Sequence, residues 1–260
     1  MVATRSNTLA LDIGGTGLKA AVLDPTGRML TDRARVDTTY PMPPDRLVAA
    51  LAALAAPLPT FDRISIGFPG VVRDRRVLTA PHFVTTAGPG TPVDPALRTA
   101  WTGFDLGAAI EHTLGRPTRV LNDADLQGLD VVAGHGVEVV MTLGTGVGSA
   151  TFDNGTLGPH LELAQHPFRK GDTYNEHLGD AARKQVGKRT WNRRLDRAII
   201  TWRTLFTFDH LYIGGGNTRH ITLTLPPDVT LIDPNAGLLG ALRLWQPVRR
   251  HTRPGARQTT

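Results

Sequence analysis

A glycine-rich segment occurs twice in this chain, with an offset of 129 residues between the two copies. Gly15-Thr16-Gly17 aligns with Gly144-Thr145-Gly146, and the residues that flank the two segments are similar as well. In each copy one apolar run leads into the glycines and a second leads from them to an aspartate, which predicts a β-hairpin. Two copies of one hairpin predict a fold of two related halves that face each other.

Both glycine turns are candidates for phosphate binding. Consecutive backbone N–H groups in such turns form concave anion sites, and glycine lets a phosphate approach the chain closely. Neither turn is a Walker loop, because the chain lacks the pattern Gly-x-x-x-x-Gly-Lys-Ser/Thr, and the spacing of Gly144, Gly146 and Gly148 does not fit a dinucleotide fingerprint. For either turn alone, a tight turn without a ligand is the alternative. The pair favours a polyphosphate group held from both sides of a cleft.

The rest of the chain alternates between predicted strands and predicted helices. Apolar runs predict strands at residues 9–13, 18–23, 63–68, 119–121, 137–143 and 210–213. Helices are predicted at residues 45–56, 105–114, 191–206 and 235–245, after residue 122, and after a capping box that starts at Thr173. This alternation indicates an α/β fold.

The length of 260 residues allows two domains. We expect an N-terminal α/β domain at residues 1–118, which carries the first glycine turn, and a C-terminal α/β domain at residues 119–247, which carries the second. Residues 248–260 are polar and basic, and they are predicted to form a disordered tail.

Composition excludes several classes of protein and site. The chain contains no cysteine, which excludes disulfides, thiolate zinc sites and cysteine nucleophiles. No apolar stretch approaches the roughly 20 residues that a membrane span needs, and the first residues do not form a signal peptide. We therefore expect a cytoplasmic protein without a membrane partner.

Positive charge is concentrated in one segment. Residues 169–203 contain ten Lys or Arg and four Asp or Glu. Such a run can bind polyphosphate or nucleic acid through counterion release. However, Arg193, Arg194 and Arg197 lie on the polar side of the predicted helix 191–206, and such a side is usually only solvated. We expect nucleic acid not to be a partner and leave polyphosphate open.

Six segments of the chain, taken together, resemble the ROK sugar kinases, and most of all the polyphosphate/ATP glucokinase branch. In chain order they read LDIGGTGLKAAVLD, ISIGFPGVV, VLNDADLQGL, TLGTGVGSA, LYIGGGN and NAGLLGAL. The resemblance implies an actin/hexokinase-like fold of two ribonuclease-H-like domains with a cleft between them. It implies a hexose substrate, ATP or polyphosphate as the donor, and Mg²⁺, and it is compatible with a homodimer.

The resemblance also assigns roles on the donor side. Asp12 would hold Mg²⁺ through water. The residues that would bind the phosphates and border the adenosine are Gly14, Gly15, Thr16, Lys19, Gly144, Thr145, Gly146, Gly214, Gly215 and Gly216. An unpaired carboxylate inside an apolar strand is costly, and a salt bridge from Asp12 to Lys19 is the alternative to a metal network.

On the sugar side, the resemblance implies contacts from Gly70, Asn122, Asp123, Glu162 and His166, with Asp123 as the general base. The chemistry needs a carboxylate, because the sugar hydroxyl must lose its proton as it attacks phosphorus. The alternative is that Asp123 only caps the helix that follows it.

The chain departs from the family motif Glu-x-Gly-His. It reads Glu162-Leu-Ala-Gln-His166, so that Ala164 and Gln165 occupy the glycine and histidine positions. Either Gln165 or the displaced His166 would then contact the sugar. The cysteine-rich zinc motif of many ROK proteins is absent, and no zinc is expected.

The function expected from these features is that of a hexose kinase that phosphorylates a sugar hydroxyl, the 6-hydroxyl of glucose above all. Two alternatives remain: a non-catalytic sugar- or nucleotide-binding protein on the same fold, and a polyanion-binding protein that uses the basic helix.

Overall fold

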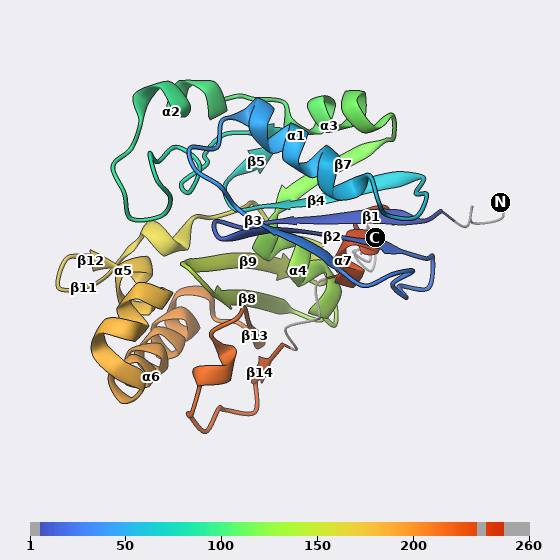
Figure 1. The fold of residues 1–260 in the computed structure, drawn as a ribbon. Coiled ribbons are helices and arrows are strands. Elements are labelled where there is room, and N and C mark those ends of the chain that lie inside the picture. The colour runs from blue at the N-terminus through green and yellow to red at the C-terminus, as the bar shows by residue number, and fades with distance from the viewer. Residues whose placement is uncertain (1–5, 233–237, 247–260) are drawn as a thin grey trace, which may run out of the picture.

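The computed structural model describes residues 6–232 and 238–246. The predicted tail at residues 248–260 and the predicted helix cap Asn235 lie outside the described residues. The described chain forms two mixed five-stranded sheets, with helices on the outer face of each sheet and between them (Figure 1). The predicted α/β class is therefore confirmed.

The first sheet has the strand order β3-β2-β1-β4-β7. Its strands are β1 (Thr8–Ile13), β2 (Gly17–Leu23), β3 (Ala34–Asp37), β4 (Arg63–Phe68) and β7 (Thr118–Asn122). β2 runs antiparallel to β1 and β3, whereas β4 runs parallel to β1 and β7. A hairpin therefore occupies one side of the sheet, and parallel strands, which require crossover connections, occupy the other.

The second sheet has the equivalent order β10-β9-β8-β13-β14. Its strands are β8 (Val137–Leu143), β9 (Val147–Asp153), β10 (Thr156–Leu157), β13 (His210–Gly214) and β14 (Val229–Leu231). β8 and β9 form the antiparallel hairpin, and β13 runs parallel to β8 and β14. The internal repeat predicted from the glycine turns is confirmed, because each turn joins the first two strands of a sheet with the same order.

The predicted domain boundary after residue 118 falls within β7. Thr118 is the first residue of this strand, which pairs with β4 in the first sheet up to Asn122. The helix α4 (Asp123–Val131) follows the strand directly, so the last strand of the first sheet and the first helix after it belong to one sequence motif.

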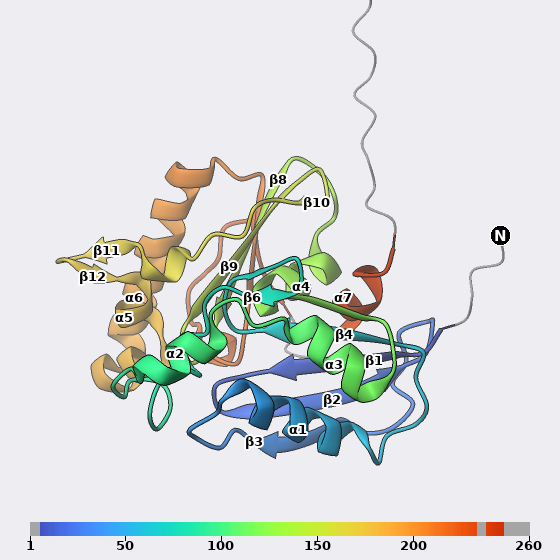
Figure 2. The ribbon, with the colours of Figure 1, turned by 90° about the horizontal axis from the view of Figure 1, so that it is seen from above.

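In the described part of the chain, seven α-helices lie around and between the sheets (Figure 2). The outer side of the first sheet is covered by α1 (Pro44–Ala55) and α3 (Leu106–Leu114), with α2 (Pro95–Trp101) beside them. α5 (Tyr174–Leu178) and α6 (Asp180–Phe206) pack on the second sheet, whereas α4 (Asp123–Val131) and α7 (Leu238–Arg243) lie between the sheets. α4 contacts strands of both sheets and therefore links the two halves.

Short elements complete the chain. They are β5 (Val72–Arg73), β6 (Arg76–Val77), β11 (Pro167–Arg169), β12 (Asp172–Thr173) and the 3₁₀ turns Leu163–Gln165 and Thr218–His220. The capping box at Thr173 is present, since its side chain and that of Glu176 satisfy each other's backbone amides. No helix among residues 6–232 and 238–246 has the length and apolar character of a membrane span.

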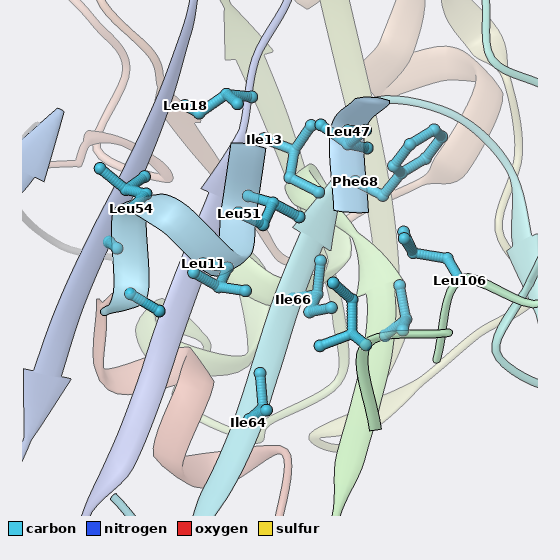
Figure 3. Packing of buried hydrophobic residues seen from close by; sticks show 14 of the residues in the cluster. Leu11, Ile13, Leu18, Leu47, Leu51, Leu54, Ile64, Ile66, Phe68 and Leu106 are labelled. Carbon is cyan, nitrogen blue, oxygen red and sulfur yellow. The ribbon is translucent and has the colours of Figure 1, made fainter. Parts of the chain in front are cut away.

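Burial on both faces explains why the sequences of the central strands are continuous apolar runs. Leu9, Leu11 and Ile13 of β1 are buried against the outer helices, whereas Ala10 is buried against α7 on the other face. Figure 3 shows Leu11 and Ile13 packed with side chains of β4 and of α1, whose Leu47, Leu51 and Leu54 follow the helical period. Strands covered on both faces lose the alternation of polar and apolar residues.

Candidate active site

A cavity of about 560 Å³ lies between the two halves and is lined by both glycine turns. β4 and β7 end at it, as expected for the carboxyl ends of parallel strands. Fourteen of the predicted residues line it: Asp12, Gly14, Gly15, Thr16, Lys19, Gly70, Asn122, Asp123, Gly144, Thr145, Gly146, Glu162, Gly215 and Gly216. The fold thus brings residues that are up to 204 positions apart, Asp12 and Gly216, to one site.

The carbonyl groups of the first glycine turn are held by the segment after β3. The Thr38 hydroxyl donates to the carbonyl oxygen of Gly14 at 2.7 Å, and the Tyr40 hydroxyl donates to that of Gly15 at 2.7 Å. The Thr38 amide donates to the carbonyl oxygen of Thr16 at 3.4 Å. Because the N–H and C=O of a peptide point in opposite directions, these bonds also fix the directions of the adjoining amides.

The second glycine turn is held in the same way by other elements. The Asp180 amide, at the start of α6, donates to the carbonyl oxygens of Gly144 at 3.1 Å and Thr145 at 3.3 Å. The side-chain amide of Asn217 donates to the Gly144 carbonyl oxygen at 2.9 Å. In both turns these carbonyl groups are thus used within the protein. The amides of Gly14 and Gly144 also donate inside their turns, at 3.0 and 2.9 Å, so the candidate donors for an anion are the other amides of the turns.

Asp12 and Lys19 face each other across the first hairpin. The Lys19 Nζ lies 2.8 Å from the Asp12 Oδ2, so the salt bridge considered for Asp12 is present. No group of three or more acidic, histidine or cysteine side chains able to hold a metal is found in the described part of the chain. Mg²⁺ commonly binds through one or two carboxylates together with substrate phosphates. A half-exposed Asp12 at the cavity fits this mode of binding.

Asn122 fixes the strand-to-helix corner at the site. Its Oδ1 accepts hydrogen bonds from the amides of Ala124 at 2.8 Å and Asp125 at 3.3 Å, so that Asn122 is the N-cap of α4. Its side-chain amide donates to the carbonyl oxygens of Gly70 at 3.1 Å and Phe68 at 3.4 Å. All four hydrogen-bonding positions of this side chain are therefore used, which makes Asn122 a positioning residue.

Asp123 is the first residue of α4, and its neighbour Asn122 supplies the cap, so the capping alternative does not account for Asp123. Burial raises the pKa of the Asp123 carboxyl to about 7, and the negative charge of Asp12 adds to the rise. A hydrogen bond from the Ala124 amide opposes it. A carboxylate with a pKa near neutrality is suited to take up and release a proton during turnover.

Two predicted residues do not reach the cavity. His166 is exposed, its Nδ1 lies 2.8 Å from the Pro167 carbonyl oxygen, and it does not line the cavity, whereas Gln165 does. The prediction of His166 as a sugar contact is therefore not supported. Gln165, the last residue of the 3₁₀ turn Leu163–Gln165, lines the cavity instead. Gly214 is buried in β13 behind the cavity, next to the side chain of Gln127.

Two histidines that sequence reasoning missed line the cavity, His82 and His160. Burial lowers the pKa of His82. The His160 side chain is 9% exposed and forms an ion pair with Asp125 in the first turn of α4. A signal existed for His160 alone, since it lies two residues before Glu162 in the segment that departs from the family motif.

Comparison with known proteins agrees with this geometry. The model of the ROK family matches residues 8–159, which is more than half of the chain. Polyphosphate glucokinase of Mycobacterium tuberculosis (strain CDC 1551 / Oshkosh) is 28% identical over 256 residues, which cover 92% of this chain and 91% of that protein. N-acetylmannosamine kinase of Escherichia coli (strain SE11) is 31% identical over 155 residues, which cover 58% of this chain and 48% of the kinase.

Solved structures share the fold. The inorganic polyphosphate/ATP-glucomannokinase of Arthrobacter sp. strain KM superposes with a TM-score of 0.77 at 28% identity, covering 91% of this chain and 97% of that one. A ROK family glucokinase from Streptomyces griseus, in complex with glucose and AMPPNP, gives a TM-score of 0.70 at 21% identity, covering 92% and 98%. The architecture is therefore the actin/hexokinase-like fold predicted from the motifs, and the chain belongs to the ROK family.

Proposed function

We propose that this protein is a glucokinase-like sugar kinase that transfers a phosphoryl group from ATP or polyphosphate to the 6-hydroxyl of glucose. The observation that carries the proposal is that two glycine turns and a carboxyl group with a pKa of about 7 line one cavity. The M. tuberculosis polyphosphate glucokinase and the Arthrobacter polyphosphate/ATP-glucomannokinase support the same donor and substrate classes.

The proposed mechanism divides the residues of the cavity between a donor end, which binds the phosphates, and an acceptor end, which binds the sugar. The backbone donors of the two glycine turns and the Lys19 ammonium bind the donor phosphates. Asp12 would hold Mg²⁺, which would neutralise phosphate charge. Asp123 accepts the proton of the sugar hydroxyl, and the hydroxyl oxygen forms a bond to the terminal phosphorus of the donor. The bond from that phosphorus to the leaving oxygen breaks, and ADP or a shortened polyphosphate departs.

An assay of glucose 6-phosphate formation from glucose and MgATP tests the proposal. The parent chain is expected to form the product. Binding of glucose or nucleotide without any product would instead favour the non-catalytic sugar- or nucleotide-binding protein. A protein that binds long polyanions in a salt-sensitive way, but neither glucose nor ATP, would favour the polyanion-binding alternative.

A second cavity favours polyphosphate as a donor in addition to ATP. It has a volume of about 520 Å³ and lies between β11 and α6; its lining is Phe168, Arg169, Thr190, Arg193, Arg194, Arg197 and Thr201. None of its four arginines forms an ion pair with a carboxylate of the described residues. α6 starts at the second glycine turn and, after a kink at Gly187 (φ 75°, ψ 162°), carries Arg193, Arg194 and Arg197, so one element connects the two cavities. A chain of many phosphates can occupy both sites at once, whereas ATP carries only three.

Replacement of Arg193, Arg194 and Arg197 by Gln tests this donor site. We expect the KM for long-chain polyphosphate to rise at least about tenfold and to lose most of its dependence on salt, because fewer counterions are released on binding. The KM for ATP should stay within about twofold of the parent value. Steady-state kinetics with each donor at several salt concentrations measure both effects.

The matched control replaces Lys188 and Arg189 by Gln. Both are exposed residues of α6 outside the second cavity. If this control weakens polyphosphate binding as much as the triple variant does, general attraction to the basic helix explains the binding, and no specific arginine-lined site is needed. If polyphosphate yields no glucose 6-phosphate at any salt concentration, the arginine-lined cavity is not a donor site.

The second glycine turn can be tested at Gly144. A Cβ atom at this position would meet no other atom within 4 Å, so a larger side chain finds open space on the cavity side. Gly144→Val should therefore leave the melting temperature and the glucose Kd close to those of the parent. It should raise the KM for ATP about tenfold or more, because the side chain occupies space where the proposed site holds phosphate. An unchanged KM for ATP would remove this turn from the donor site.

A further inference from the structure

A buried histidine with one free ring nitrogen lies in the wall of the cavity. The Nδ1 of His160 is 3.0 Å from one carboxylate oxygen of Asp125 and 3.1 Å from the other. Its Nε2 has no hydrogen-bond partner and lies 3.6 Å from the Oε1 of Glu162, beyond hydrogen-bonding distance. The side chains of His160 and Asp125 are 9% and 5% exposed. Buried polar atoms are rarely left unpaired, so an unpaired one at a cavity indicates a ligand.

The orientation of the ring is set by the same corner that positions Asp123. The Asn122 side chain caps α4 and accepts a hydrogen bond from the Asp125 amide at 3.3 Å. This cap holds Asp125 in the first turn of the helix. The hydrogen bond that the His160 Nδ1–H donates to the Asp125 carboxylate fixes the ring, and the opposite nitrogen is then directed away from Asp125. His160 and Glu162 both line the cavity.

Both ring nitrogens of His160 are donors at neutral pH. Burial disfavours the imidazolium, but the carboxylates of Asp125 and Glu162 outweigh this effect and raise the pKa of His160 to about 10. Nδ1–H donates to Asp125, and Nε2–H is left as a charged donor beside the carboxylate acceptor of Glu162.

We propose that His160 is a sugar-binding residue of this kinase, whose Nε2–H donates a hydrogen bond to a ring hydroxyl of the acceptor sugar while the Glu162 carboxylate accepts a hydrogen bond from the same hydroxyl or its neighbour. This inference rests on the proposed function. A donor and an acceptor 3.6 Å apart match a hydroxyl, which can both accept and donate a hydrogen bond. Gln165, which stands in the histidine position of the family motif, lines the same cavity and leaves the cationic donor to His160.

The local charge favours a sugar over a phosphate at this place. One imidazolium stands against the two carboxylates Asp125 and Glu162, and the pKa of Asp123 is raised in part by Glu162. A phosphate would be repelled by this excess of negative charge, whereas a neutral hydroxyl is not. The surroundings of His160 therefore belong to the acceptor end of the cavity.

The test measures glucose binding by calorimetry for the parent, His160→Ala, His160→Gln and His166→Ala. We expect His160→Ala to weaken glucose binding about 10- to 100-fold, the usual range for a hydrogen bond to a charged group. His160→Gln, which keeps a side-chain donor, should recover part of the loss. His166→Ala removes an exposed histidine of the same segment and should bind glucose like the parent.

A series of deoxyglucoses separates a direct contact from a structural role. In the parent, each sugar that lacks a contacted hydroxyl should bind more weakly than glucose. In His160→Ala, the loss of affinity relative to glucose should disappear for deoxyglucoses that lack one or two adjacent hydroxyls and should persist for the others. The KM of this variant for ATP should stay within about twofold of the parent value. Penalties that persist at every position would overturn the contact, as would an unchanged glucose Kd in His160→Ala. A parent chain that binds no sugar at all would overturn the proposed function together with this inference.

Discussion

Asp123→Asn is expected to lower the turnover number for glucose phosphorylation by about 10²- to 10⁴-fold, the range that a general base contributes. Asparagine keeps the size of the side chain but cannot accept the hydroxyl proton. Glucose binding should change by less than about tenfold, because the remaining sugar contacts stay in place. Steady-state kinetics and a glucose titration of the same variant measure the two quantities.

Asp45→Asn is the matched control for this prediction. Asp45 lies in the first turn of α1, as Asp123 lies in the first turn of α4, but it is exposed and distant from the cavity lining. Turnover of Asp45→Asn should equal that of the parent. If Asp123→Asn also keeps its turnover within a few-fold, then Asp123 serves the helix and not the chemistry.

The pH dependence of kcat/KM for glucose should show an acid limb near pH 7. Burial and the charge of Asp12 raise the pKa of Asp123, so its carboxyl is protonated, and inactive as a base, below about pH 7. Below this value kcat/KM should fall about tenfold per pH unit and should be about 100-fold lower at pH 5, because one protonation inactivates the base. The limb reports the pKa in the free enzyme, since kcat/KM does so.

The residual activity of Asp123→Asn provides the control for the pH profile. The profile of this variant should lack the acid limb near pH 7. A limb in the parent near pH 4, where an ordinary aspartate titrates, would mean that Asp123 is not desolvated in the working enzyme. A parent limb that persists unchanged in Asp123→Asn would assign it to another group.

The repeated hairpins could be predicted from the sequence because their signals are local. Glycines at the turn and apolar runs on both sides specify a hairpin within about 15 residues, and the offset of 129 residues revealed the second copy. The structure adds one difference between the copies. Ile13 pairs with Leu18 across the first turn, whereas Leu143 pairs with Val147 across the second, so the first turn is longer by one glycine.

The partners of the site residues could not be predicted, because they depend on contacts between distant segments. Asp125 and His160 are 35 positions apart, and neither has a motif that points to the other. The choice between Gln165 and His166 depended on a short 3₁₀ turn whose direction is set by packing on β9. Near the end of α6 the helical period likewise fails as a guide to burial, because Leu205 is 54% exposed although the period places it on the side of the buried Trp202.

The central claim is that one donor lies between the two glycine turns with the sugar hydroxyl at Asp123. A crystal structure with glucose and a non-hydrolysable ATP analogue tests it most directly. The account predicts phosphate oxygens within hydrogen-bonding distance of backbone amides of both turns, and the glucose 6-hydroxyl within hydrogen-bonding distance of the Asp123 carboxylate. Phosphates that contact one turn only, or a glucose whose 6-hydroxyl lies away from Asp123, would contradict it.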